Sequence, residues 1–298
     1  LKTVANVESG IIGAYASMNV TMGILLNSVF ADEVRVAEFY NAATVHEWQY
    51  GSTDISIRDN FTAFPMYYRT IDRVNRVLAA LPNAKAANAT EEALKNRIRG
   101  EALFMRAFCH FGLYQFYSNT SDGTALALAY METPDLLPQA RITVAPYMAK
   151  LNADLVAAKA LVPATNADIA RASRHAVTGL QARVALYMKD YTNAVTYLNA
   201  FSSDDDILGP IAKGGIGDAF VQLEQLEDAY DYYVQAAQLK SNDYTTPMYL
   251  YKAGVIGLKL GNNSKALGFF NQIKSDFPQS TEAKDIDVFI GKAEAASN

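Results

Sequence analysis

Aromatic and polar side chains gather between residues 30 and 68, a mixture typical of a sugar-binding surface. The C–H face of a pyranose ring stacks on an aromatic ring, and neighbouring amides and charged groups hydrogen-bond the hydroxyls. The segment holds the single tryptophan of the chain. The candidate ligand contacts are Tyr40, Asn41, Trp48 and Tyr50. A core position for the aromatic members of this set is the alternative, and the sequence leaves both interpretations open.

A core position is favoured for three further aromatic residues of the region. Phe64, Tyr67 and Tyr68 come directly before apolar residues at helical spacing, which predict a buried helix face. We therefore do not expect these three to contact a ligand.

Catalytic chemistry finds little support in the residues. The histidines, His46, His110 and His175, form no HExxH motif and no cluster with carboxylates, and the sequence contains no nucleophile elbow or Walker A loop. The single cysteine, Cys109, and His110 lie in an apolar helical run, which indicates a buried thiol and a hydrogen-bonded core histidine. We expect no enzyme activity, no catalytic residue, no metal site and no cofactor.

Two polar or glycine-rich segments could be mistaken for ligand sites. Gly214-Gly215-Ile216-Gly217 lacks both the preceding strand and the Lys-Ser/Thr ending of a phosphate loop, which favours helix packing. Asp204-Asp205-Asp206 has no EF-hand spacing and is interpreted as a linker and helix cap.

Composition sets the protein class. The chain has 298 residues, of which 50% are apolar, and a net charge of −5, which favours a folded core and disfavours nucleic acid as a partner. No apolar run reaches 18 residues, so we expect no transmembrane segment. Because the chain begins with Leu1 and no signal peptide follows, we expect any targeting signal to lie upstream.

The charge changes abruptly after Ser203. Residues 1–203 hold 12 Arg and 6 Lys against 17 acids, whereas residues 204–298 hold 8 Lys and no Arg against 14 acids. The two parts therefore carry +1 and −6. The sequence predicts two domains, residues 1–203 and 204–298.

The fold class is predicted to be all-α. Helical patterns recur near 4–18, 62–81, 90–117, 143–162, 173–188, 191–201, 207–223, 226–240, 247–260, 263–276 and 280–296. Thr90 and Thr246 are the expected N-caps of two of these helices. The helix near 90–117 is apolar on two faces, so both must be covered. Residues 19–60 and 118–142 are expected to form long loops.

Internal repeats indicate an α/α superhelix of tetratricopeptide-type hairpins. In this pattern small residues at positions 8, 20 and 27 and an aromatic residue at 24 let two helices interlock. From Pro210 these positions are Gly217, Ala229, Ala236 and Tyr233. From Pro247 they are Gly254, Ala266, Ile273 and Phe270, and a weaker unit starts at His175. The last helix is expected to act as a solvating cap.

Such hairpins line a groove with their first helices. The groove positions of the last repeat are largely apolar, which favours packing of another helix over binding of a peptide carboxylate. The candidate partner groove is formed by Met248, Tyr251, Val255 and Leu258.

The pattern RxExxFxRAxxxF, at Arg99 to Phe111, resembles the RagB/SusD family of outer-membrane nutrient-binding lipoproteins. The segments Leu1–Tyr15, Arg141–Ala158 and His175–Ala194 are also similar to that family, so that the resemblance covers about residues 1–201. Residues 204–298 look like a separate tetratricopeptide segment, and the chain could be a fusion.

The resemblance implies a helical protein that sits on a TonB-dependent outer-membrane transporter and captures a glycan or other small nutrient. It also implies an outer-membrane protein with a lipid anchor on a cysteine upstream of Leu1, the periplasm being the alternative location. The leading hypothesis is therefore non-enzymatic nutrient binding as the partner of such a transporter. The alternative is a tetratricopeptide scaffold for protein–protein interaction in the cell envelope.

Overall fold

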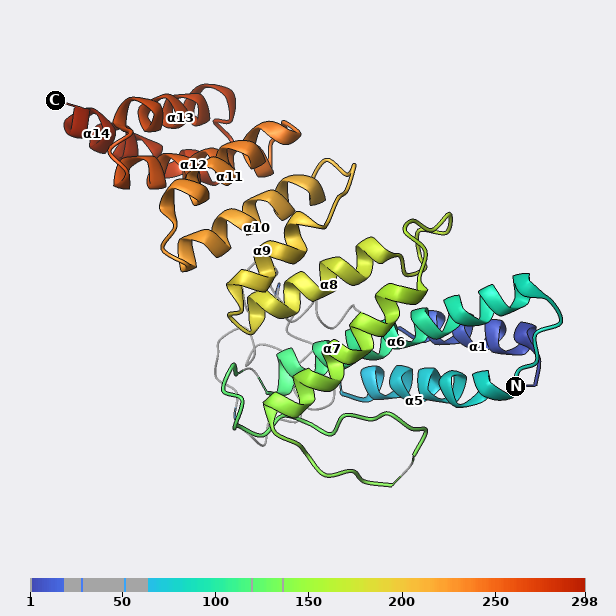
Figure 1. The fold of residues 1–298 in the computed structure, drawn as a ribbon. Coiled ribbons are helices and arrows are strands. Elements are labelled where there is room, and N and C mark those ends of the chain that lie inside the picture. The colour runs from blue at the N-terminus through green and yellow to red at the C-terminus, as the bar shows by residue number, and fades with distance from the viewer. Residues whose placement is uncertain are drawn as a thin grey trace, which may run out of the picture. The chain divides into compact units, whose positions relative to one another are not determined.

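The computed structural model describes residues 2–18, 28, 51, 64–118, 120–135 and 137–297 (Figure 1). Within these ranges it is helical, with isolated β-bridges but no strand, which confirms the all-α prediction. The α-helices are α1 (Val4–Ser17), α5 (Phe64–Ala80), α6 (Ala89–Tyr117), α7 (Val144–Leu161), α8 (Arg174–Tyr187), α9 (Tyr191–Asn199), α10 (Leu208–Gln222), α11 (Leu226–Leu239), α12 (Thr245–Lys259), α13 (Asn263–Asp276) and α14 (Ile286–Ser297). Two 3₁₀ helices, η2 (Leu81–Asn83) and η3 (Glu282–Asp285), complete them. None of these helices combines the length and the apolar character that crossing a membrane requires.

The chain forms two compact units, Leu1–Val177 and Thr178–Asn298. The division falls inside α8, before the charge change at Ser203. Helix α9 lies before Ser203 in the chain, but it packs against α10 and so belongs with the C-terminal helices. The change in composition therefore does not coincide with the division in packing. The assignment of residues 1–203 and 204–298 to separate domains stays a prediction.

Helix α6 is the centre of the first unit. It packs against α1, α5 and α7, so both of its apolar faces are covered, as the sequence predicts. Met105 and Cys109 on one face are fully buried, and Phe104 and Phe111 on the other are at most 9% exposed. Between α6 and α7 the chain forms the expected long irregular segment.

Polar side chains are also buried beneath this segment. The Arg106 guanidinium donates to both carboxylate oxygens of Asp154 on α7, at 2.7 and 2.6 Å, and both side chains are only 9% exposed. Arg106 also donates to Asn75 Oδ1 on α5 at 3.1 Å, and the Tyr130 hydroxyl donates to Asp154 at 2.7 Å. Asn75 in turn donates to the carbonyl oxygens of Met131 and Thr133, at 2.9 and 3.3 Å. The network joins three helices, α5, α6 and α7, to the irregular segment, and it gives the buried guanidinium the hydrogen-bond partners that a buried charge requires.

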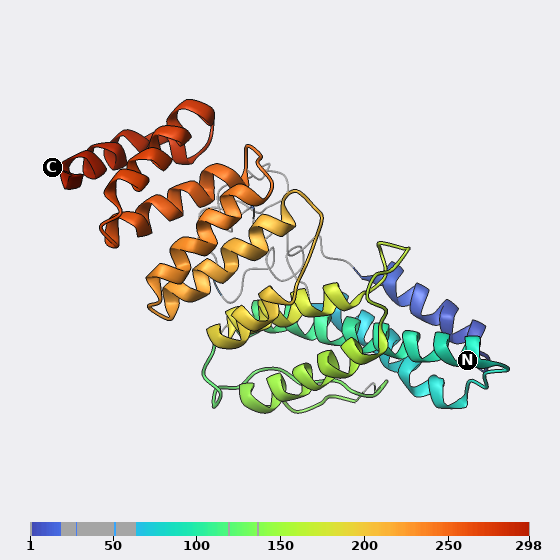
Figure 2. The same ribbon diagram turned by 45° about the horizontal axis from the view of Figure 1, so that its top comes forward.

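The second unit shows the tetratricopeptide interlock directly. A Cβ atom placed on Gly217 would lie 2.7 Å from the Tyr233 ring, and one on Gly254 would lie 2.4 Å from Phe270. These pairs occupy positions 8 and 24 of the two repeats, so the aromatic ring fills the space that the missing side chain leaves. Each helix from α9 to α14 packs against the next (Figure 2). The superhelix prediction is confirmed.

Two predicted helix starts are wrong. Helix α6 begins at Ala89, and the side chain of Asn88, not that of Thr90, accepts the Glu91 N–H at 2.9 Å. Helix α12 begins at Thr245, so Thr246 lies in the first turn, and Asn242 Oδ1 accepts the Thr245 N–H at 2.7 Å. In both cases an asparagine placed earlier in the chain offers the oxygen that caps the free N–H groups.

The C-terminal segment also differs from the single helix predicted over 280–296. It is divided into η3 and α14, and α14 buries only Ile286 and Ala293 among its described residues. Phe289 and Ile290 are partly buried against the core, and the opposite face of α14 is exposed, as a terminal capping helix requires.

The glycine interlock predicts opposite effects of one substitution at two sites. Gly254→Ala should lower the free energy of unfolding by about 1–3 kcal/mol, because its Cβ would overlap the Phe270 ring. Gly268→Ala on α13, where no atom lies within 4 Å, should raise it by about 0.5–1 kcal/mol. Urea unfolding of both variants measures the difference, and a shift in the same direction would contradict the interlock.

The buried ion pair predicts a larger loss. Asp154→Asn leaves the Arg106 guanidinium buried without its counter-ion and should cost about 3–5 kcal/mol. The matched control, Asp72→Asn, breaks the exposed pair with Arg76 and should cost about 0–1 kcal/mol. Equal losses in urea unfolding would show that the buried pair does not hold the unit together.

Candidate functional site

The candidate sugar contacts lie outside the described residues. Nothing in the structure therefore tests Tyr40, Asn41, Trp48 and Tyr50. Their three aromatic neighbours are described. Tyr67 is 6% exposed and Tyr68 is half-buried, but Phe64 is 44% exposed, so the core interpretation is wrong for Phe64. Burial raises the pKa of Tyr68 to about 12, and its hydroxyl donates to the Ala129 carbonyl at 3.0 Å.

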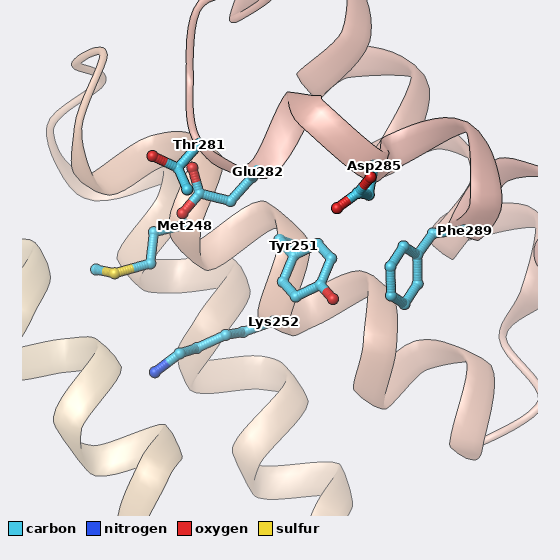
Figure 3. Close-up of a pocket in the computed structure, with 7 residues that line it drawn as sticks. All are labelled: Met248, Tyr251, Lys252, Thr281, Glu282, Asp285 and Phe289. Carbon is cyan, nitrogen blue, oxygen red and sulfur yellow. The ribbon is translucent and has the colours of Figure 1, made fainter. Parts of the chain in front are cut away.

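The candidate partner groove lies on α12, and Figure 3 shows two of its residues, Met248 and Tyr251. Met248, Tyr251, Val255 and Leu258 are all partly buried against the core of the second unit. Only two of the four residues share a site: Met248 and Tyr251 line a pocket of about 350 Å³, and Val255 and Leu258 do not line it. The remaining lining residues are Lys252, Thr281, Glu282, Asp285 and Phe289.

The pocket combines an aromatic wall with charged groups. The rings of Tyr251 and Phe289 meet edge to face, with centroids 4.9 Å apart and planes at 77°. Lys252 Nζ donates to Asp218 on α10 at 2.7 Å. Burial, and after it the negative charges of Asp285 and Glu282, raise the pKa of the Tyr251 hydroxyl, which stays protonated at neutral pH. The arrangement can hold a ligand that has an apolar part and a polar or cationic end.

Sequence reasoning missed the α14 side of this pocket. Phe289 and the acids Glu282 and Asp285 were expected on a solvated cap, and the pattern around them is that of an ordinary amphipathic helix. Phe289 is partly buried against the core of the unit. An aromatic residue close to two acids in the terminal segment is the signal that could have pointed to the pocket.

A second hollow of about 250 Å³ lies in the first unit. It is bordered by α5 and the segment 131–135, and Tyr68, Asp72 and Asn75 lie on its helical side. Because Asn75 already bonds the carbonyls of this segment, the hollow is the seam between helix and loop.

The histidine and cysteine of α6 are core residues, as predicted. His110 Nε2 accepts the Met131 N–H at 3.2 Å, and Nδ1 lies 3.0 Å from the Tyr147 hydroxyl. Burial lowers the pKa of His110 to about 3, so the imidazole is neutral at physiological pH. Burial raises the pKa of the Cys109 thiol, which is therefore not a nucleophile at neutral pH. Among the described residues, no three acidic, histidine or cysteine side chains come together to hold a metal ion.

Two charged residues of the RxExxFxRAxxxF pattern bind other parts of the protein, whereas Arg99 is exposed. Glu101 accepts from Arg171 at 2.8 Å, and Arg106 pairs with Asp154. Arg141, which begins the similar segment Arg141–Ala158, donates to the carbonyls of Leu126 and Ala127. Glu101, Arg106 and Arg141 therefore hold the helices and the irregular segment in place.

The glycine-rich and acidic segments serve the fold. A Cβ atom on Gly214 would lie 1.9 Å from the Tyr249 ring, which confirms helix packing. Asp205 Oδ1 accepts the N–H groups of Ile207 and Leu208, at 2.9 and 2.8 Å, and these hydrogen bonds lower the pKa of its carboxyl. Asp205 therefore caps the start of α10, as the sequence predicts.

Several solved structures have a similar fold over the whole length of this chain. A SusD-like carbohydrate binding protein from Bacteroides vulgatus is 17% identical, with a TM-score of 0.58 and coverage of 100% of this chain and 81% of that one. A SusD superfamily protein from Bacteroides fragilis is 15% identical, with a TM-score of 0.58 and coverage of 100% and 86%. At such identities the likeness shows the fold alone. The similarity in fold extends over the helices of residues 204–298. The idea that the chain is a fusion of two proteins therefore has no support from these structures.

The family comparison is more specific. A search of the curated proteins found no match. The model of the SusD-like_3 family, described as starch-binding associating with outer membrane, matches residues 2–186. This range contains the RxExxFxRAxxxF helix, Arg141 and Asp154. The match covers more than half of the chain, and the chain therefore belongs to the SusD-like family.

Proposed function

We propose that the protein binds a glycan or other small nutrient at the bacterial outer membrane and is not an enzyme. The observation that carries the proposal is the family match over residues 2–186, whose description names starch binding and the outer membrane. A neighbour in fold is also named a carbohydrate binding protein.

We place the glycan site at Tyr40, Asn41, Trp48 and Tyr50. The described residues support this placement by elimination. The buried charged side chains of α6, Glu101 and Arg106, are bonded within the fold, and the hollow beside Asn75 is a seam closed by hydrogen bonds. The aromatic and amide groups near Trp48 offer what a sugar requires, a ring to stack on and groups that bond its hydroxyls.

The partner in this proposal is a TonB-dependent outer-membrane transporter. A nutrient-binding protein delivers its ligand efficiently when it is held beside the transporter. The bound ligand is then present at a high effective concentration at the entrance of the transporter. A lipid anchor outside this chain would hold it at the outer membrane, and the periplasm is the alternative. Fractionation of cells that make the native protein decides between them, because only an anchored protein sediments with outer membranes in high salt.

A scaffold for protein–protein interaction is the second candidate function. It is favoured by the partly buried apolar row Met248, Tyr251, Val255 and Leu258, which remains accessible on α12. Leu258→Glu should abolish recovery of a protein partner from envelope extracts, whereas Val288→Glu, at a 56% exposed position of α14, should not. Recovery that is equal for both variants would count against this function.

The glycan site predicts the effect of one truncation. Trp48→Ala should weaken binding of an oligosaccharide by at least about tenfold, roughly 1.4 kcal/mol, because the stacking surface is lost. Isothermal titration calorimetry with a panel that includes starch-derived maltooligosaccharides measures it. Tyr244→Ala, which removes an aromatic ring that is 64% exposed in the second unit, is the control and should leave binding unchanged. A wild-type protein that binds no member of the panel would overturn the proposal.

A further inference from the structure

The pocket between α12, η3 and α14 has two unlike walls (Figure 3). Met248, Tyr251 and Phe289 form the apolar one, and Glu282 and Asp285 place carboxylates beside it. Its volume of about 350 Å³ lies at the lower end of the range for small-molecule sites. A pocket of this size can hold a small ligand or one side chain.

The two carboxylates have no partner within the described part of the chain. Some acids of the same unit are paired, for example Asp218 with Lys252 and Asp287 with Lys274, both at 2.7 Å. Glu282 and Asp285 form no such ion pair or hydrogen bond with a described residue. Lys252 borders the pocket, but its ammonium group is held by Asp218 and points away from both acids (Figure 3). The negative charge of the pocket is therefore free to act on a ligand.

The aromatic wall favours a linear ligand over a sugar ring. Tyr251 and Phe289 meet at 77°, which makes a corner and not the flat platform on which a pyranose stacks. Aromatic faces also attract cations. Lys292, which does not line the pocket, already places its ammonium group 4.8 Å from the centre of the Phe289 ring. The net charge of −6 over residues 204–298 adds a longer-range attraction for cations.

We propose that this pocket binds an alkylammonium group. The aliphatic chain lies in the corner of Met248, Tyr251 and Phe289, and the ammonium group lies against Glu282 and Asp285. Two sources carry this chemistry, the lysine side chain of a protein and a free aliphatic amine. The site is independent of glycan binding at Trp48 and takes a different class of ligand.

Hexylammonium is a direct probe of this site, and 1-hexanol is its uncharged counterpart. In NMR titrations of the full chain, hexylammonium should shift the resonances of Tyr251 and Phe289, and 1-hexanol should bind at least about tenfold more weakly because it lacks the charge. The double variant Glu282→Gln/Asp285→Asn should lose about tenfold in hexylammonium affinity, since both partly exposed carboxylates that attract the ammonium group are neutralised. Equal affinity for the two probes, or an unchanged double variant, would overturn the proposal.

A matched control variant shows whether a loss of hexylammonium binding comes from the two pocket carboxylates or from the general negative charge of the unit. Glu294→Gln removes an acid from α14, the helix that carries Phe289, but outside the pocket, and it should leave hexylammonium binding unchanged. If Glu294→Gln and the double variant weaken binding equally, general charge is responsible and the proposal fails. A blocked peptide that contains one lysine separates the sources, because tighter binding than hexylammonium indicates a protein side chain and weaker binding a free amine. Trp48→Ala should leave both affinities unchanged, so this site and the glycan site can fail separately.

Discussion

The first unit depends on the pairing of Arg106 with Asp154. A guanidinium buried on α6 must find a carboxylate, and the one it finds lies on α7, so the distance between these helices is set by two hydrogen bonds of 2.7 and 2.6 Å. The guanidinium also donates to the side chain of Asn75 on α5, and Asn75 donates to the carbonyls of Met131 and Thr133. An irregular segment is thereby ordered without strands or helices of its own.

The second unit is held together in another way. Its helices approach each other where glycine faces an aromatic ring, as at Gly254 and Phe270, and apolar contacts carry the packing. Since the interlock uses few charges, the acids of this unit are available at the surface. Two of them, Glu282 and Asp285, border the pocket of α12 and α14, whereas the buried Glu101 and Arg106 of α6 are bonded within the first unit. The units therefore differ in what they can offer a ligand.

Much of the fold was predictable from local pattern. The helix over Asn263–Asp276 has the predicted bounds, because apolar spacing and flanking breakers are properties of neighbouring residues. The tetratricopeptide positions were also predictable from the sequence. The glycine and the aromatic residue at Gly217 and Tyr233 have equivalents with the same separation in the next repeat, Gly254 and Phe270. The caps at Asn88 and Asn242 were missed, because several polar residues stand near each helix start and only the backbone path selects the one that bonds.

Local patterns along the chain established the helical class, the repeats, the core role of His110 and, around Arg106, the resemblance to the family. They also marked Met248 and Tyr251 as groove positions. The folded structure was needed to show that Arg106 meets Asp154, that α8 contains the division between the units, and that Phe289 and Asp285 join Tyr251 in one pocket. The physical reason is that periodicity records which face of a helix is buried, whereas the partner of a side chain depends on how distant helices pack.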